Sequence, residues 1–115
     1  FLNWVKHSDP LLESAYAASK VFVLPSLYET PGRSALEAGL AKSNIVITPF
    51  GGTKEYFSNY ATYVNPYSIK KIQESIINSI NSNRSDNLSI HIKQNFLWEI
   101  IAKKLKTEYE KLLTL

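Results

Sequence analysis

The stretch "VFVLPSLYETPGRSALEAG", residues 21–39, joins a continuous apolar run to a helical pattern through a turn that contains proline and glycine. The apolar run at 21–25 predicts a strand buried on both faces, because continuous rather than alternating apolar residues are typical of a parallel sheet. A helix is predicted over about 34–41. Glu29 lies in the turn and Glu37 inside the helix. The stretch therefore predicts an α/β sheet with two carboxylates near the end of one strand.

The rest of the chain continues this alternation of strands and helices. Further apolar runs predict strands, and capped or periodic segments predict helices. Alternation of this kind indicates an α/β fold, a Rossmann-like parallel sheet with helices on both faces. The strands are expected at 1–5, 21–25, 44–48 and 61–64, and the helices after Asp9-Pro10, at 34–41 and 53–57, after Ser68, and at about 98–113.

Length and composition restrict the function classes. The 115 residues suffice for one domain, and 44% hydrophobic with 20% charged residues is typical of a globular protein. The absence of cysteine excludes disulfides and thiolate metal sites. The net charge of +3 is spread along the chain without a basic stripe, so we expect no nucleic-acid partner. No apolar run approaches the roughly 20 residues of a membrane span.

The turn after the run at 21–25 has the features of an anion site. Ligands of open parallel sheets bind beyond the carboxyl ends of the strands. Gly32 permits a positive φ or a close backbone approach, and the following helix directs free N–H groups and its positive dipole end toward the same crevice. Arg33 adds a positive charge. This combination predicts binding of a phosphate or diphosphate.

Two carboxylates beside an anion site are expected to face hydroxyl groups, because they would repel phosphate. A carboxylate accepts two hydrogen bonds from a vicinal diol, so Glu37 and Glu29 together suit the ribose and the sugar of a sugar nucleotide. From spacing alone a second interpretation stays open, in which Glu29 caps a turn and Glu37 is an ordinary helix residue. The two isolated histidines, His7 and His91, form no metal site, although His7 lies near the predicted crevice.

Residues 21–57, "VFVLPSLYETPGRSALEAGLAKSNIVITPFGGTKEYF", resemble the donor-binding stretch of the retaining glycosyltransferases of family 4, which have the two-domain GT-B architecture. The similarity rests on Glu29, on the Glu37-Ala38 pair, and on the downstream Gly51-Gly52-Thr53-Lys54-Glu55. The two glycines position a loop near the donor or simply end the strand. Residues 1–26 and 96–113 are similar to the flanking parts of that family, so the resemblance covers nearly the whole chain.

This resemblance implies a role for each matching residue. Glu37 would hold the ribose hydroxyls of the donor, and Glu29, the candidate catalytic residue, would contact the transferred sugar. Transfer would retain configuration and need no metal and no cofactor. The remaining donor-binding candidates are Val5 beside the base and Pro31, Gly32, Arg33 and Ser34 around the sugar and diphosphate. Pro31, Arg33 and Lys42 depart from the family pattern, and Lys42 stands where glycine is usual.

The resemblance also implies a domain organisation. Residues 1–115 would be part of the C-terminal, nucleotide-sugar-binding domain of a larger enzyme, with residues 98–113 as its closing helix. The saccharide or lipid-linked acceptor would bind to a missing N-terminal domain. Trp98 is expected to anchor the core.

We expect a cytoplasmic protein, with peripheral contact to the inner membrane face left open. The chain alone is expected to be inactive and to self-associate through an open sheet edge. A non-catalytic nucleotide-binding module and a structural α/β module remain the alternatives.

Overall fold

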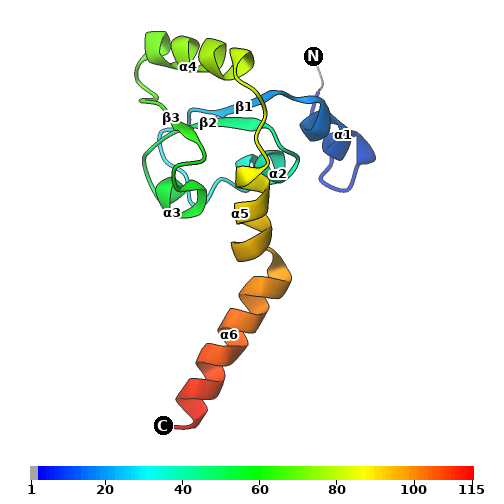
Figure 1. Ribbon diagram of the computed structural model, residues 1–115, viewed down its shortest axis with the longest axis vertical. Coiled ribbons are helices and arrows are strands. Elements are labelled where there is room, and N and C mark those ends of the chain that lie inside the picture. The colour runs from blue at the N-terminus through cyan, green and yellow to red at the C-terminus, as the bar shows by residue number, and fades with distance from the viewer. Residues whose placement is uncertain (1–2) are drawn as a thin grey trace.

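The computed structural model describes residues 3–115, and within them the sheet has three parallel strands in the order β1-β2-β3 (Figure 1). The strands are β1 Val21–Leu24, β2 Asn44–Ile47 and β3 Thr62–Tyr63. Val21 pairs with Asn44 and Leu24 with Ile47, so β1 and β2 are in register along their full length. The three strands predicted from residue 21 onward are thus confirmed.

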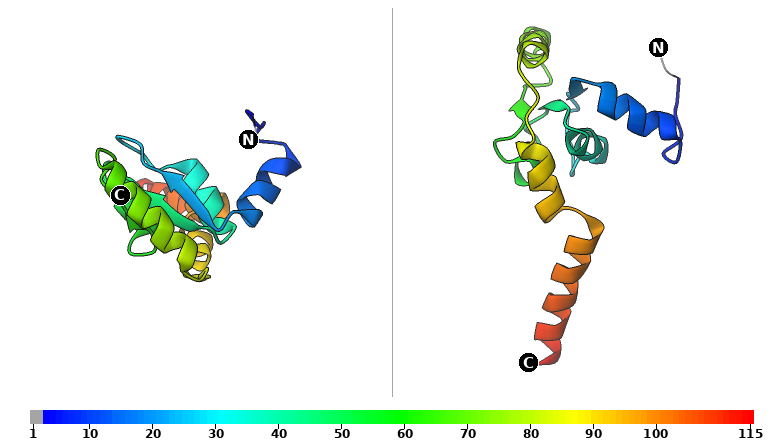
Figure 2. Two further views of the ribbon diagram at one scale, coloured as in Figure 1. Left: turned by 90° about the horizontal axis from the view of Figure 1, so that it is seen from above. Right: turned by 45° about the vertical axis from the view of Figure 1, so that its right-hand side comes forward.

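Helices cover both faces of this sheet, which confirms the predicted fold class. The helix α2 contacts β1 and β2 on one face, and α4 contacts the same two strands on the other (Figures 1 and 2). The helix α5 packs on α2. The helices are α1 Pro10–Ala18, α2 Arg33–Leu40, α3 Thr53–Phe57, α4 Ile69–Asn81, α5 Asn87–Asn95 and α6 Trp98–Leu113.

Two of the predicted helix starts have the expected caps. The Asp9 carboxylate accepts a hydrogen bond of 2.9 Å from the Leu11 N–H, and Pro10 occupies the first helical position of α1. The Ser68 hydroxyl accepts a hydrogen bond of 3.3 Å from the Lys71 N–H at the start of α4. These side chains satisfy N–H groups that have no partner inside the helix.

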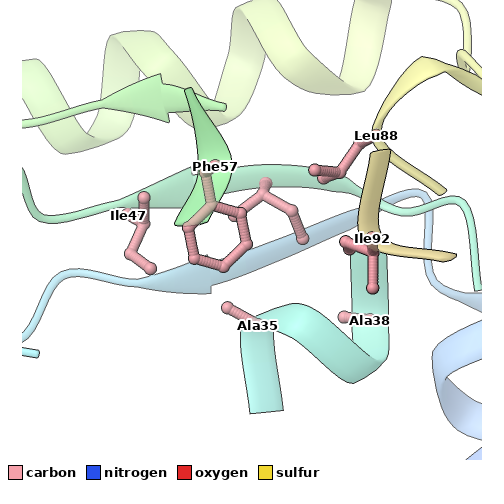
Figure 3. Close-up of a cluster of buried hydrophobic side chains, with 7 residues drawn as sticks. Ala35, Ala38, Ile47, Phe57, Leu88 and Ile92 are labelled. Carbon is pink, nitrogen blue, oxygen red and sulfur yellow. The ribbon is translucent and has the colours of Figure 1, made fainter. Parts of the chain in front are cut away.

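The core is centred on β2, which lies between the other two strands. Ile45, Val46 and Ile47 are almost fully buried. Phe57, at the end of α3, inserts between β2 and the helices α2 and α5 (Figure 3). The buried faces of α2 carry only small residues, Ala35, Ala38 and Gly39, so neighbouring elements approach it closely. A Cβ atom at Gly39 would lie 2.8 Å from Leu88 Cδ2 of α5.

The predicted strand at 1–5 is wrong where it can be assessed. Residues 1 and 2 lie outside the described residues, and residues 3–5 are irregular. Asn3 and Trp4 are exposed. A strand requires hydrogen bonds to a neighbouring strand. Within the described residues β1 has no partner other than β2, so residues 3–5 do not extend the sheet. The apolar composition of "FLNWV" was therefore insufficient to place it in the sheet.

The helix α6 projects away from the sheet, and none of its residues is buried (Figures 1 and 2). Its apolar side chains Ile101, Leu105, Tyr109 and Leu112 are all exposed to solvent. Trp98 is 79% exposed, so the expectation that it anchors the core of this chain is wrong. Within residues 3–115, the main contact of α6 is with α5, the helix that precedes it.

Lys42 adopts the left-handed conformation, with φ of 71°, in the turn between α2 and β2. This conformation favours glycine because a Cβ atom crowds the following carbonyl oxygen. The structure thus gives the physical reason that the resembling family usually has glycine at this position. The Lys42 ammonium forms a salt bridge of 3.0 Å with Asp86 just before α5.

Candidate functional site

The start of α2 faces the crevice beyond the carboxyl end of β1. Gly32 precedes α2 with φ of 84°, and it is buried against Leu24 and Ile47 of the two neighbouring strands. No side chain caps this helix, and its first turn contains no acidic residue. The N–H groups and the positive dipole end of α2 are therefore left to interact with an anion.

Glu29 is fixed by a backbone connection to the loop that follows β2. The Glu29 N–H donates to the Phe50 carbonyl oxygen at 3.2 Å, and the Gly52 N–H donates to the Glu29 carbonyl oxygen at 3.0 Å. Gly51 pairs with Glu29 in an isolated parallel bridge and has φ of 96°. The two glycines thus hold the loop after β2 against the loop that carries Glu29.

Glu37 lies between two adjoining clefts. Its side chain is 33% exposed, and its Oε1 atom lies 3.8 Å from His7 Nδ1. The first cleft, of about 410 Å³, separates α1 from α2. It is lined by His7, Leu12, Glu13, Tyr16, Glu37, Leu40 and Ala41.

The second cleft, of about 480 Å³, lies between α2 and the junction of α5 with α6. It is mostly apolar, and the rings of Tyr56 and Phe96 pack in it at a centroid distance of 5.0 Å. Arg33 and Glu37 supply charges of opposite sign at its polar side. It is lined by His7, Pro31, Arg33, Leu36, Glu37, Leu40, Tyr56, Ile92, Phe96, Leu97, Trp98 and Ile101.

Tyr16 of α1 shares the first cleft with Glu37. Burial raises the pKa of Tyr16 above its ordinary value of 10.0, and the charge of Glu37 and a hydrogen bond to its carboxylate raise the pKa further. The Tyr16 ring packs edge to face on Phe22 of β1, with centroids 5.8 Å apart. The phenol therefore remains protonated near neutral pH.

The structure brings some of the predicted site residues together and leaves others apart. Pro31, Arg33 and Glu37 line the second cleft. Gly32 is buried beneath them, and Ser34 is half-buried in the first turn of α2. Neither of the two clefts is lined by Glu29, Val5 or Ser34. Val5 is half-buried in the irregular segment before α1.

Tyr16 is a site residue that sequence reasoning missed. Tyr16 lies in α1 and Glu37 in α2, with β1 between the two helices, so no local motif connects the two side chains. The order of elements could have indicated that the two helices are neighbours, because α1, β1 and α2 follow one another along the chain. Consecutive elements of this kind usually lie side by side.

Residues 3–115 show neither a metal centre nor a membrane-spanning helix. This part of the chain contains no group of three or more His, Asp or Glu side chains arranged to hold a metal ion. None of its helices is both long enough and apolar enough to cross a membrane.

The parallel sheet, the helices on both faces and the carboxylate beside an uncapped helix start define a Rossmann-like ligand-binding domain. The family model of the glycosyl transferases group 1 matches residues 1–96, and the chain belongs to this family. The predicted resemblance is thereby confirmed over this range, and a nucleotide-sugar donor is implied. Searches of curated proteins and of solved structures gave no match. The matched range ends two residues before α6, so it is shorter than the resemblance suggested.

Proposed function

We propose that residues 1–115 form part of the donor-binding domain of a retaining hexosyltransferase, which takes the hexose from a nucleoside diphosphate sugar. The observation that carries this proposal is the position of Glu37. Its carboxylate opens onto two adjoining clefts, one helical turn from the uncapped start of α2. A carboxylate that accepts hydrogen bonds from a diol, next to N–H groups that attract a diphosphate, matches the two ends of a ribose diphosphate.

The other site residues take roles around this centre. Arg33 and the N–H groups at the start of α2 bind the diphosphate, with Gly32 allowing its close approach. Glu29, held on the loop beside Gly51, contacts the transferred hexose. Pro31 and Ser34 complete the surface around the sugar and diphosphate, and Val5 flanks the base. No metal and no cofactor takes part in this scheme.

The acceptor, a saccharide or a lipid-linked saccharide, is proposed to bind to a second domain that faces these clefts. Retaining transfer requires the donor, the acceptor and polar groups held together with water excluded. The two clefts described above supply one wall of such a site. We propose that the enzyme acts in the cytoplasm, or at the inner face of the membrane where a lipid-linked acceptor would lie. The absence of cysteine is compatible with a reducing compartment.

Calorimetric titration of the full-length protein with UDP, GDP and ADP tests the donor site. Saturable binding of one of these supports the proposal, and no binding of any favours a structural module. Release of the nucleoside diphosphate from a sugar donor in the presence of acceptor then distinguishes an enzyme from a non-catalytic nucleotide-binding module.

A further inference from the structure

We propose that Glu13 is a specificity-determining residue of the donor site and that it selects guanine, so that the donor is a GDP-hexose. This inference rests on the proposed function, because it names the base of the nucleotide that this function requires. Glu13 of α1 and Glu37 of α2 line the same cleft of about 410 Å³, between the two helices. The cleft thus has a second carboxylate besides the one assigned to the ribose.

The charges that line the two clefts decide which end of the nucleotide each cleft takes. Arg33, in the first turn of α2, lines the second cleft but not the first. The described residues that line the first cleft include the carboxylates of Glu13 and Glu37, and neither lysine nor arginine. A diphosphate is disfavoured there, because like charges brought together cost binding free energy. The diphosphate therefore lies toward Arg33, and the nucleoside lies on the other side of Glu37, in the first cleft.

The first cleft has a size and walls that suit a nucleobase. Its volume of about 410 Å³ lies in the range of small-ligand sites, which is about 300–1,000 Å³. Leu12 and Tyr16 line it from α1, and Leu40 and Ala41 line it from the end of α2. Apolar and aromatic surfaces from two sides suit a planar base, which stacks through its faces and forms hydrogen bonds at its edge.

The wall of the cleft that α1 provides is attached firmly to the rest of the domain. The buried hydroxyl of Ser43 donates a hydrogen bond of 3.1 Å to the Tyr16 carbonyl oxygen. The Arg84 guanidinium donates to the carbonyl oxygens of Ala17 and Ala18, at 2.9 and 3.1 Å. These contacts satisfy carbonyl oxygens in the last turn of α1 that have no partner inside the helix. A wall that is fixed before the ligand arrives reduces the ordering cost of binding.

Glu13 has the hydrogen-bonding groups that complement guanine. It lies three residues before Tyr16 and therefore on the same side of α1. The residue is exposed, and within residues 3–115 its carboxylate forms no salt bridge. A carboxylate has two acceptor oxygens and no donor. The Watson–Crick edge of guanine offers two adjacent donors, N1–H and the 2-amino group, which the two oxygens can accept together.

The other common bases complement a carboxylate less well. Uracil has a single donor, N3–H, between two carbonyl oxygens that a carboxylate repels. Adenine has one amino donor beside N1, which is itself an acceptor. A site built for a hydrogen-bonding pattern rejects a ligand that leaves its polar groups unpaired. We therefore expect GDP to bind more tightly than ADP and UDP.

Calorimetry on the full-length protein tests this inference with GDP, ADP, UDP and inosine diphosphate, which is GDP without the 2-amino group. The unmodified protein should bind GDP about 10-fold more tightly than inosine diphosphate, which is within the range for a bidentate base contact. Glu13→Gln keeps the side-chain length but replaces one acceptor oxygen by a donor. It should weaken GDP binding by about 10-fold and bring the affinities for GDP and inosine diphosphate together. The affinities for ADP and UDP should change little.

Glu99→Gln is the matched control for this substitution. Glu99 is an exposed residue in the first turn of α6, as Glu13 is in α1, but it lines neither cleft. Both substitutions remove a carboxylate that interacts favourably with a helix N-terminus. The affinities for all four nucleotides should be unchanged in Glu99→Gln.

Tighter binding of UDP or ADP than of GDP would overturn the choice of guanine and leave the nucleotide site of the proposed function in place. Equal affinities of GDP and inosine diphosphate in the unmodified protein would overturn it as well. Equal weakening of all four nucleotides by Glu13→Gln, or no weakening of GDP, would overturn the role of Glu13. If none of the four binds to the unmodified protein, the proposed function fails and this inference fails with it.

Discussion

Gly51 lies against the backbone of Glu29 so closely that a Cβ atom at position 51 would overlap the Glu29 carbonyl oxygen. The contact joins the loop after β1 to the loop after β2, at the carboxyl ends of two neighbouring strands. Two residues that are 22 positions apart in the sequence thus lie against each other at this end of the sheet. Glycine is required at position 51 both by this contact and by its φ of 96°.

Replacement of this glycine should disturb the position of Glu29. We expect Gly51→Ala to lower the free energy of unfolding by about 1–3 kcal/mol, because a Cβ atom is strained at this φ and forces the two loops apart. Sugar transfer by the full-length protein should fall with it. Urea unfolding and a transfer assay measure the two effects.

Gly52→Ala is the matched control for this substitution. A Cβ atom at Gly52 has its nearest neighbour 3.7 Å away, in the Tyr56 ring, and the residue has φ of −87°. A smaller loss of about 0.5–1 kcal/mol is expected, because alanine is a poorer N-cap than glycine. Equal effects of the two substitutions would argue against the contact with Glu29.

Glu37→Ala should weaken nucleotide binding while leaving the fold intact. The expected loss is about 1–3 kcal/mol of binding free energy, the range for hydrogen bonds to a charged group. Alanine has a high helix propensity, so the stability of α2 should change little. Calorimetry and thermal unfolding of the same variant check the two parts. An unchanged affinity would reject the assignment of Glu37 to the ribose.

Alkaline pH should destabilise the domain through its half-buried tyrosines. Burial raises the pKa of Tyr63, and burial together with Glu37 raises the pKa of Tyr16, above the ordinary value of 10.0. Above pH 10.0 these phenols lose their protons in the unfolded chain before they do so in the folded one. The stability that they contribute is therefore fully present below pH 10.0 and is lost as the pH rises toward their folded-state pKa values.

The variant Tyr16→Phe should show a smaller loss of stability between neutral pH and a pH one unit above 10.0. Urea unfolding at the two pH values provides the measurement, and Tyr60→Phe controls for the removal of a phenol from the surface. The same pH dependence in Tyr16→Phe and in the unmodified chain would contradict the assignment.

The 115-residue chain should not transfer sugar by itself. Its clefts offer one wall for the donor, and Arg33 is the basic residue that lines the second of them beside His7. Catalysis of the transfer requires further groups that stabilise the leaving diphosphate and position the acceptor. A radiolabelled-donor assay on the purified chain checks this expectation, and glycosylation of an acceptor would disprove it.

The same chain should self-associate at high concentration. Among the described residues, β1 pairs with β2 alone, so its outer edge presents unpaired backbone groups. The exposed apolar residues of α6 add a second surface through which two copies of the chain can associate. Light scattering measures the molar mass in solution, and a clean monomer at high concentration would count against the prediction.

The sequence by itself determined the elements whose signals are local. The continuous apolar runs of β1 and β2 predicted buried parallel strands, and the caps at Asp9 and Ser68 predicted the starts of α1 and α4. The turn at Gly32 predicted a ligand site at this end of the sheet, which stays a prediction. Each of these depends on neighbouring residues, either through burial periodicity or through a hydrogen bond within one turn of helix.

The tertiary structure alone decided the remaining features. The helix α5 was not predicted, because its buried face consists of only Leu88, Ser89 and Ile92, and it forms where Gly39 of α2 leaves room for it. The segment at 3–5 is irregular and does not pair with the open edge of β1, which its apolar composition alone did not reveal. Tyr16 and Glu37 line the same cleft only because the fold places α1 beside α2. Such contacts depend on which surfaces pack together, a property of the whole fold that no short stretch of sequence contains.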